Sequence, residues 1–294
     1  MIINKQLWEK AYLLLSKQKV SRQKLSELLE VSDRTAGNLI FAFENLQLLK
    51  FEPEIYEIEN KRTILFFSDL HIPFENKISV EIMLDYVKQI KPDTIIVGGD
   101  LIDFYKISTY IKNPKERNTN IEIKLAKQFL INLRNDFPDS EIIYIEGNHE
   151  QRFERYIIKN AVELYDVLEN FYPEKLGLEH LNIKYQKGVF RIGKLWFLHG
   201  HEVNVRNYNV EYITNVMWKR IHSNFICGHW HRTQDKTWKN ISGKYYAGFV
   251  VGALCKDLDY QPINNWNNGF AVIRFDNRGF YKVENKKIIN GEIY

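Results

Sequence analysis

The residues best suited to chemistry in this sequence stand at the ends of short apolar runs. Five runs each lead into histidine, aspartate or asparagine: Asp69-Leu70-His71, Gly98-Gly99-Asp100, Gly147-Asn148-His149-Glu150, His199-Gly200-His201 and Gly228-His229-Trp230-His231. Six of the eight histidines lie in these segments, and only His180 and His222 lie outside them. One histidine at a strand end is usually structural. Burying so many ionisable groups together costs on the order of several kcal/mol unless something pairs with them.

A pair of divalent cations would compensate that cost. Imidazole nitrogen, carboxylate oxygen and amide oxygen together suit borderline transition metals. We therefore expect two divalent transition-metal ions, with Mn²⁺ preferred and Fe, Zn or Ni as alternatives. The glycines beside these residues allow tight turns and a close approach of the backbone.

The elements that must position these residues alternate between strands and helices. Strands are predicted at Arg62–Ser68, Thr94–Val97, Ile142–Glu146, Leu195–Leu198, Asn224–Cys227, Tyr245–Val251, Phe270–Phe275 and Phe280–Glu284, and helices near Lys77–Ile90 and Ile121–Asn135. This alternation predicts an α/β fold, with helices outside a sheet and ligands at the carboxyl ends of its strands. The strands after His231 are expected to extend a second sheet packed on the first, and Glu169–His180 is expected to be a surface excursion.

The ordered motifs D-x-H, G-D-x-x-D, G-N-H-E, H-G-H and G-H-x-H resemble those of the calcineurin-like metallophosphoesterases. The resemblance covers roughly Arg62 to Phe275, and the chain looks similar to phage and bacterial members. It implies a four-layer α/β/β/α sandwich, here preceded by a small all-α domain. It also implies that one metal binds Asp69, His71 and His231, that the other binds Asn148, His199 and His229, and that Asp100 bridges both.

That arrangement implies hydrolysis of a phosphoester bond. A hydroxide bridging the two metals would attack phosphorus, and the metals would neutralise charge on the phosphoryl oxygens. His149, beside the metals, is the expected general acid for the leaving oxygen. Asp103 is expected to orient His149 and favour its charged form, with a simple capping role as the alternative.

Residues around the motifs favour a phosphodiester, and nucleic acid above other diesters. Phe104 and Tyr105 follow Asp103, where protein phosphatases carry an arginine that grips a phosphomonoester. The expected substrate contacts are Arg152, Arg155, His201, Arg206, Trp230 and Arg232, with Trp266 as a further stacking ring. Each has an ordinary alternative as a solvated charge, a core aromatic or a stabilising contact. Two rival functions stay open: hydrolysis of small nucleotides, and DNA-binding regulation with the sandwich as a scaffold.

The apolar spacing in residues 1–50 predicts three helices. Part of this region resembles a helix-turn-helix. Ser21 and Ser32 stand at expected N-caps, whereas Glu30 takes the turn position that usually holds glycine. The expected nucleic-acid contacts are Lys17, Lys19, Arg22, Lys24, Arg34 and Asn38. The alternative is a helical bundle for protein contacts or homo-oligomerisation.

Composition bounds the remaining possibilities. Residues 51–60 contain four glutamates and Pro53, and we interpret them as an acidic linker between the helical domain and a phosphoesterase domain at 61–294. The apolar runs are too short to cross a bilayer, the amino terminus lacks a signal-peptide pattern, and there are only two cysteines. We therefore expect no membrane partner and a cytoplasmic location in a bacterium or a phage-infected cell. The net charge of +4 is too small to indicate whether the protein binds nucleic acid.

Overall fold

The computed structural model describes residues 11, 14–15, 20–37, 39–40, 53–58, 60–108, 118–168, 170–205, 210–256 and 264–294. The chain divides into two compact units, Met1–Pro53 and Glu54–Tyr294. Among the described residues, no helix has both the length and the apolar character needed to cross a bilayer.

The second unit contains two mixed sheets. The larger has the strand order β13 (Glu292–Ile293), β12 (Tyr281–Ile289), β11 (Asn268–Phe275), β2 (Arg62–Phe67), β3 (Thr94–Val97), β4 (Glu141–Ile145), β5 (Ile183–Gln186). The smaller has the order β1 (Ile55–Tyr56), β6 (Phe190–Ile192), β7 (Leu195–Phe197), β8 (Phe225–Cys227), β10 (Tyr245–Val250), β9 (Gln234–Lys239). Strands β2 to β5 pair in parallel, as do β7, β8 and β10, so within each set the carboxyl ends share one edge.

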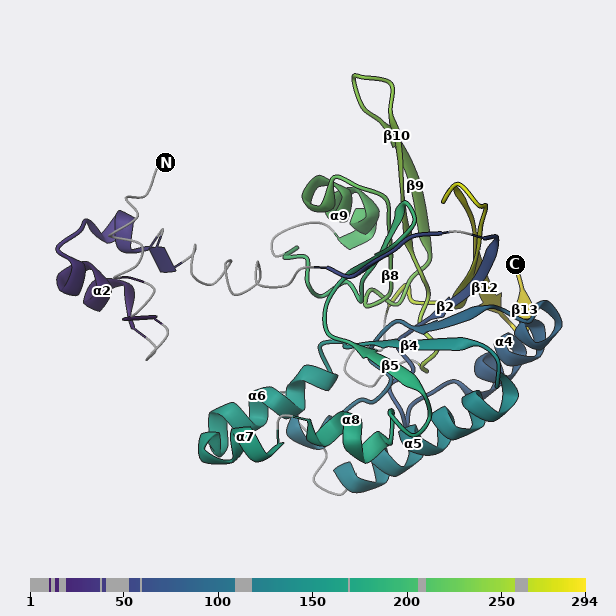
Figure 1. Cartoon of the computed structure of the whole chain (residues 1–294), viewed down its shortest axis with the longest axis horizontal. Helices are drawn as coiled ribbons and strands as arrows, with labels where there is room; N and C mark the ends of the chain where they lie inside the picture. Colours follow the sequence, from purple (N-terminus) through teal and green to yellow (C-terminus); the bar gives the residue numbers. More distant parts are fainter. Residues whose placement is uncertain are drawn as a thin grey trace. The chain divides into compact units, whose positions relative to one another are not determined.

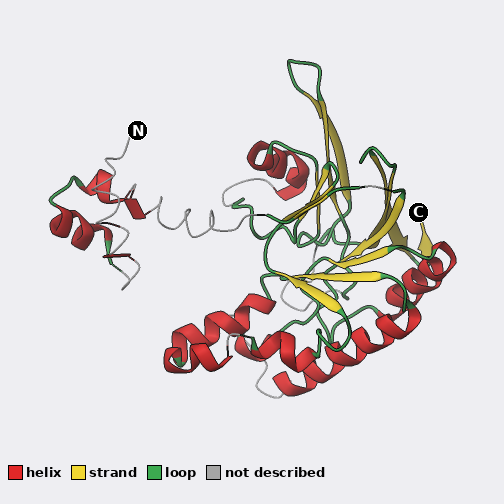
Figure 2. Cartoon of the chain, in the orientation of Figure 1, coloured by secondary structure: helices red, strands yellow, loops and turns green. Residues whose placement is uncertain are grey.

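Helices cover the outer faces of both sheets (Figure 1). From the bottom of the view upward, the layers are a group of helices, the larger sheet and the smaller sheet, and a single helix lies at the left of the smaller sheet. The lower group includes α4 (Lys77–Ile90), α5 (Thr119–Asp136) and α8 (Phe171–Leu176), with α6 (Glu150–Asn160) and α7 (Tyr165–Leu168) beside it, and the upper helix is α9 (Ile213–Ile221). The expected α/β/β/α sandwich is thus confirmed. Figure 2 shows that the β9–β10 hairpin projects beyond the sheet.

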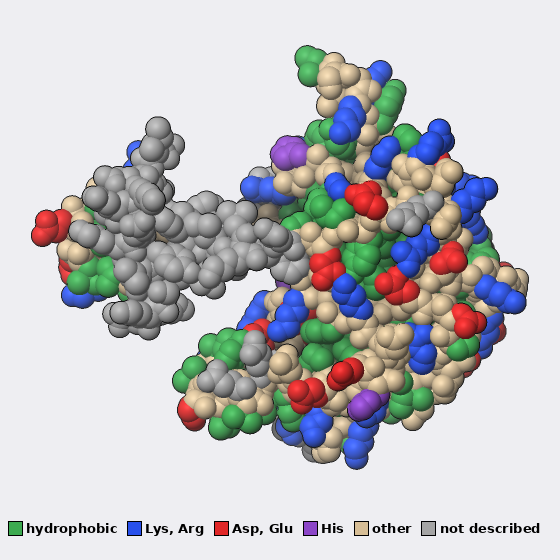
Figure 3. Space-filling model, in the orientation of Figure 1, with side chains coloured by type: hydrophobic (Ala, Val, Ile, Leu, Met, Phe, Trp, Pro, Cys, Tyr) green, Lys and Arg blue, Asp and Glu red, His purple; other side chains and the backbone are tan. Residues whose placement is uncertain are grey.

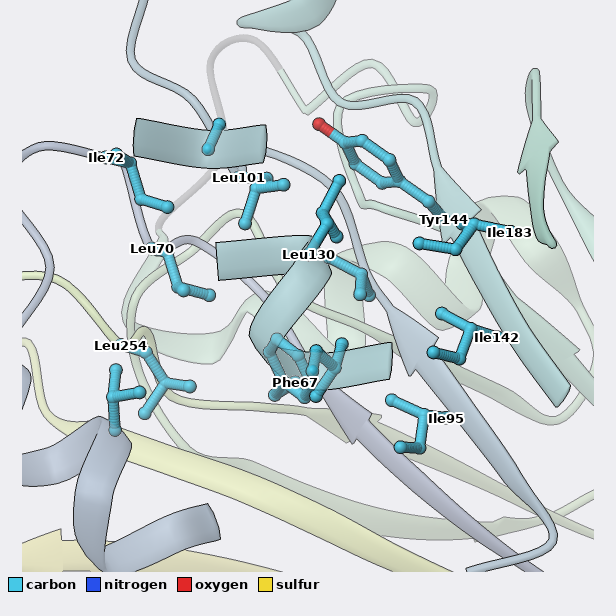
Figure 4. Close-up of a cluster of buried hydrophobic side chains, with 14 of the residues drawn as sticks. Phe67, Leu70, Ile72, Ile95, Leu101, Leu130, Ile142, Tyr144, Ile183 and Leu254 are labelled. Carbon is cyan, nitrogen blue, oxygen red and sulfur yellow. The ribbon is translucent and has the colours of Figure 1, made fainter. Parts of the chain in front are cut away.

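Alternating side chains explain why the central strands read as continuous apolar runs. In β2, Leu65 and Phe67 pack toward the helices, whereas Ile64 and Phe66 pack between the sheets. Strands that are buried on both faces lose the usual alternation of apolar and polar residues. The helix-side core also holds Leu70 and other residues from the loops at the strand ends (Figure 4).

Two expectations for this unit are wrong. Residues 169–180 were expected on the surface, but Tyr172, Leu176 and Leu178 are buried against the larger sheet and its helices. The acidic stretch is not a linker along its whole length, because Ile55 and Tyr56 form β1 and pair with β6.

The first unit contains the helix α2 (Arg22–Leu29), whose N-cap is Ser21 as expected. Glu30 ends this helix in a left-handed conformation, with φ 53°, and the Oγ of Ser32 accepts from the amide of Thr35 at the start of the next helical turn. The side chains of Leu25, Ala36 and Leu39 are buried together. The helix-turn-helix interpretation and its role in binding DNA stay predictions.

Candidate active site

The loops after five strands bring the seven expected metal ligands together at one edge of the sandwich. Asp69 and His71 follow β2, Asp100 follows β3, Asn148 follows β4, His199 follows β7, and His229 and His231 follow β8. Asn148 and His229 are half-buried and the other five are buried. The structure therefore places the predicted set in one buried polar cluster.

One half of this cluster contains Asp69, His71 and His231. The Nε2 atoms of His71 and His231 lie 3.1 Å apart, and Oδ1 of Asp69 lies 3.3 Å from Nε2 of His231. The other oxygen of Asp69 is held in place, since it accepts from the Ser68 hydroxyl at 2.6 Å and the His229 amide at 2.8 Å. Oδ1 is buried and has no hydrogen bond within the described part of the chain.

The other half contains Asn148, His199 and His229. The Nε2 atom of His199 lies 3.2 Å from Oδ1 of Asn148 and 3.2 Å from Nδ1 of His229. Asp100 lies between the halves, with its Oδ2 at 3.2 Å from Nε2 of His199 and 3.9 Å from Nε2 of His71. This position is the one that a bridging carboxylate requires.

The backbone at this edge is strained. Five of the seven expected ligands have a left-handed φ between 48° and 68°: Asp69, His71, Asp100, His229 and His231. Such conformations cost residues other than glycine on the order of 1–3 kcal/mol each, and they concentrate at functional sites. The neighbouring buried side chains of Leu70 and Leu101 hold two of these loops in the core (Figure 4).

Two glycines let the loops approach the carboxylates. A Cβ atom at Gly147 would lie 2.2 Å from Oδ1 of Asp100, and one at Gly228 would lie 2.4 Å from Oδ2 of Asp69. Any larger residue at either position would displace an expected metal ligand.

His149 lies beside the cluster, as predicted. Its Nδ1 lies 2.9 Å from the carbonyl oxygen of Asp103, and a guanidinium nitrogen of Arg152 lies 2.7 Å from its Nε2. Since guanidinium only donates, Nε2 is the acceptor and Nδ1 carries the hydrogen. Burial lowers the pKa of His149, and this outweighs the attraction of Asp100 and Asp103. Asp103 acts in the expected direction, since its hydrogen bond raises the pKa of His149, although burial has the larger effect.

Asp103 contacts a second histidine that the sequence did not link to it. Its Oδ1 lies 3.1 Å from Nδ1 of His71 and 3.2 Å from Nδ1 of His149. Burial alone would raise the pKa of Asp103, but its hydrogen bonds to the two histidines hold it below the usual value. Burial would likewise lower the pKa of His71, but the carboxylates of Asp103 and Asp69 raise it to about 10.

Glu150 is a positioning residue that the sequence analysis did not assign. One carboxylate oxygen accepts from the amides of Gly147 at 2.7 Å and Asp100 at 3.0 Å. The other accepts from the amide of Leu101 at 2.9 Å and the hydroxyl of Tyr144 at 2.7 Å. Burial and the nearby charge of Asp100 raise the pKa of Glu150 to about 7. This one side chain thus joins the loops after β3 and β4. The sequence signal that could have identified Glu150 was its place at the end of the G-N-H-E motif.

Two further residues support the histidines. The carboxylate of Glu202 accepts from the amides of His199 at 3.0 Å and Gly200 at 2.6 Å, which closes that turn. The thiol of Cys255 lies 3.8 Å from Nδ1 of His231, on the side of the ring away from Asp69. The Glu202 contacts lie within three residues of one another at the H-G-H motif, whereas the Cys255–His231 contact joins residues 24 positions apart.

The expected substrate contacts fall into several environments. Arg152 contacts His149, and Arg155 is exposed one turn further along α6. His201 lies beside the cluster, with its ring centre 5.4 Å from that of His199.

The other residues expected to contact substrate pack against neighbouring side chains or are buried. The ring of Trp230 packs on His229 at 4.8 Å between centres, and that of Trp266 packs on His231 at 4.4 Å. Arg232 is buried, with its Nε donating to the Trp230 carbonyl. Arg206 lies outside the described residues.

The expected nucleic-acid contacts of the first unit also differ from one another. Arg22 forms an ion pair with Asp33 at 2.8 Å, and Lys24 lies 3.5 Å from Glu27. Arg34 is exposed. Lys17, Lys19 and Asn38 lie outside the described residues.

The cluster fits a pair of divalent cations. Three of its overlapping groups place possible ligand atoms within 4.8 Å of one another: Asp69, His71 and Asp100; Asp100, His199 and His229; and His71, His231 and Cys255. The Oδ1 of Asp69, which accepts no hydrogen bond within the described residues, and the facing imidazole nitrogens supply the oxygen and nitrogen donors that borderline metals prefer.

Comparison with known proteins agrees with this chemistry. The model of the calcineurin-like phosphoesterase family matches residues 62–261. The Gene 54 protein of Mycobacterium phage L5 is 25% identical over 239 residues, covering 73% of this chain and 89% of the phage protein. The Gene 54 protein of Mycobacterium phage D29 is also 25% identical, over 230 residues, with the same coverage.

Among solved structures, Vacuolar Protein Sorting 29 from Cryptosporidium parvum aligns with a TM-score of 0.45 at 12% identity, covering 80% of this chain and 95% of that one. The phosphoesterase Yfce from E. coli aligns with a TM-score of 0.35 at 13% identity, covering 76% and 98%.

Proposed function

This chain belongs to the calcineurin-like phosphoesterases, which are metal-dependent hydrolases of phosphoester bonds, and we propose that its own substrate is a phosphodiester of nucleic acid. The observation that supports the proposal is the cluster of seven expected metal-ligand side chains, five of them buried, with Arg152 and His149 at its side.

Asp69, His71 and His231 would hold one cation, Asn148, His199 and His229 the second, and Asp100 both. Bound there, the two cations would supply an activated water as nucleophile and neutralise charge on the phosphoryl oxygens. Mn²⁺ is our preferred identity for both, on the basis of the mixed nitrogen and oxygen donors.

The chain's own residues handle the leaving oxygen. Nε2 of His149 lies 3.7 Å from Oδ2 of Asp100, so the ring faces the same space as the metal ligands. In the proposed reaction, Nε2 of His149 first takes up a proton from solvent as the Arg152 guanidinium turns from it to the phosphoryl oxygens. His149 then gives that proton to the leaving oxygen as a general acid, and Arg152 stabilises the departing charge. Asp103 positions His149 and His71 together.

The preference for a diester rests on the loop after Asp103. Phe104 is buried, with its ring centre 6.0 Å from that of Phe153 and 5.2 Å from that of Tyr172. It therefore offers no cation to the terminal oxygens of a monoester. A diester carries less charge on its phosphoryl group than a monoester and needs fewer cations.

One substrate comparison tests the proposal. Bis-p-nitrophenyl phosphate, p-nitrophenyl phosphate, single-stranded DNA, duplex DNA, RNA and small cyclic or dinucleotides are each incubated with the Mn²⁺-loaded protein. We expect hydrolysis of the synthetic diester well above the monoester, and of at least one polymer. Cleavage of small nucleotides without any polymer would reject nucleic acid as the substrate. DNA binding without hydrolysis of any compound would favour a regulator with a scaffold sandwich.

A further inference from the structure

A groove with a volume of about 940 Å³ opens at the other end of the sandwich. Its lining includes Trp196 in β7 and Asn224 just before β8, whereas His199 and His229 follow the carboxyl ends of those two strands. The β6–β7 turn, the β9–β10 hairpin and the β11–β12 turn form its walls. Among its described lining residues, this surface, which we call the basic–aromatic groove, includes none of the seven expected metal ligands.

Cations line this groove. Arg191, Lys194, Lys244 and Arg278 contribute to it, and Glu57 is the acid among its described lining residues. Arg191 lies 3.6 Å from Glu57, but its Nε is buried and has no hydrogen bond in the described part of the chain.

Exposed aromatic rings lie between these cations. Tyr245 is 63% exposed and Phe280 is 53% exposed. The ammonium of Lys194 lies 3.3 Å from the centre of the Phe280 ring, and that of Lys244 lies 5.1 Å from the centre of Tyr246. On the face drawn in Figure 3, the projecting tip of the hairpin shows hydrophobic and Lys or Arg side chains without acidic ones.

We propose that the basic–aromatic groove is a binding site for single-stranded nucleic acid, separate from the site of hydrolysis. A single strand would place its phosphates on the cations and its bases on the rings, and the flexible side chain of Lys194 would leave the face of Phe280 that it covers. A duplex keeps its bases stacked inside and would leave the rings unused, and an acidic peptide has no flat bases to place on them. The inference goes beyond the proposed hydrolysis, because binding here needs neither metal nor turnover.

Binding of a fluorescein-labelled 20-mer of thymidylate to the full chain, measured by anisotropy in EDTA, tests the proposal. Tyr245→Ala should weaken binding by at least about fivefold through the loss of one stacked base, and Tyr245→Phe should bind as the wild type does. Lys194→Ala with Lys244→Ala should weaken binding and lower the slope of log affinity against log salt by about 1.4. The matched control, Lys77→Ala with Lys124→Ala, removes the same charge from exposed positions on α4 and α5.

Photocrosslinking separates this groove from any contribution of residues 1–53. A 5-bromodeoxyuridine 20-mer should crosslink to peptides containing Trp196, Tyr245 or Phe280. Crosslinks confined to other peptides, or equal losses in the control variant, would overturn the proposal. So would a loss in the lysine variant with none in Tyr245→Ala, since the groove would then be a general anion surface. All variants should hydrolyse bis-p-nitrophenyl phosphate as the wild type does. Groove binding without cleavage of any polymer would reject the proposed function and leave this inference standing.

Discussion

At the scale of the residue, His149 and Arg152 form one unit beside the expected metal ligands. The guanidinium of Arg152 lies 2.7 Å from Nε2 of His149, so loss of the imidazole removes both the proton donor and a partner that positions the arginine. We expect His149→Ala to retain its metals and to slow hydrolysis of a dinucleotide by roughly 10²–10⁴-fold, as for a general acid. The loss should be smaller with bis-p-nitrophenyl phosphate, because p-nitrophenolate leaves without protonation.

Steady-state kinetics on both substrates, with metal content measured in parallel, checks this expectation. Arg152→Ala should show a weaker form of the same trend. If His149→Ala slows both substrates equally, the histidine acts through electrostatics and not as an acid.

Glu150 leads to a different kind of prediction, because the hydrogen bonds described above join it to backbone amides and to the Tyr144 hydroxyl. In Glu150→Gln an amide group replaces one carboxylate oxygen and faces N–H donors, so buried hydrogen bonds are lost. We expect the metal-free protein to lose about 1–3 kcal/mol of unfolding free energy. The loaded protein should bind metal less tightly, since the loops after β3 and β4 are no longer joined.

Urea denaturation in EDTA, together with metal titration, measures both effects. Glu174→Gln, at an exposed position in α8, is the matched control. An unchanged unfolding free energy and an unchanged metal affinity would show that the Glu150 hydrogen bonds are dispensable.

At the scale of the element, the short strand β1 belongs to the sandwich although it lies in the acidic stretch. The amide of Arg191 donates to the Glu54 carbonyl at 3.0 Å, and the ring of Tyr56 packs on Phe190 at 5.8 Å between centres. A chain beginning at Pro53 should keep these contacts, and one beginning at Asn60 should lose them. We expect the shorter chain to be less stable by about 2 kcal/mol, which lowers its Tm by about 4–8 °C.

Thermal unfolding of the two truncated chains under identical buffer conditions decides this point. Equal Tm values would contradict a structural role for β1 and would support the interpretation of these residues as a linker.

The same elements show why some of the fold could be predicted and some could not. β3 (Thr94–Val97) and α4 (Lys77–Ile90) were predicted at their observed bounds, because one is an unbroken apolar run and the other a regular amphipathic helix. β9, with the sequence QDKTWK, was missed because it is an edge strand with largely exposed side chains. α8 was missed because it is only six residues long and contains Pro173, and its burial depends on packing against α5 and the larger sheet.

The site residues could also be predicted only in part, because their contacts across the fold could not be read from the sequence. The ligand types could be read directly, since each motif holds its own histidine, aspartate or asparagine. The Asp103–His71 contact joins residues 32 positions apart, and the bond from Glu150 to Asp100 joins residues 50 apart. Such contacts arise from the parallel order of the strands, which a single sequence does not show.

At the scale of the whole molecule, removal of the first unit tests whether it helps the enzyme to bind its substrate. If residues 1–53 deliver the enzyme to nucleic acid, a chain beginning at Pro53 should show a higher KM for long polymer and an unchanged kcat/KM for bis-p-nitrophenyl phosphate. Binding by the full chain should weaken with added salt. Because Arg22 is paired with Asp33, Arg34→Ala should reduce binding more than Arg22→Ala does.

Kinetics beside size-exclusion chromatography separates delivery from assembly. A truncated enzyme that cleaves polymer as well as the full chain, but changes from oligomer to monomer, would make the first unit an assembly module.

The metal content of the purified protein tests the central claim most directly. After loading with Mn²⁺ and removal of the excess, elemental analysis should find close to two ions per chain. Asp100→Asn, which weakens the carboxylate placed between the two halves of the cluster, should lose at least one ion and the turnover of bis-p-nitrophenyl phosphate. A well-folded wild-type protein that binds no metal under these conditions would contradict the account.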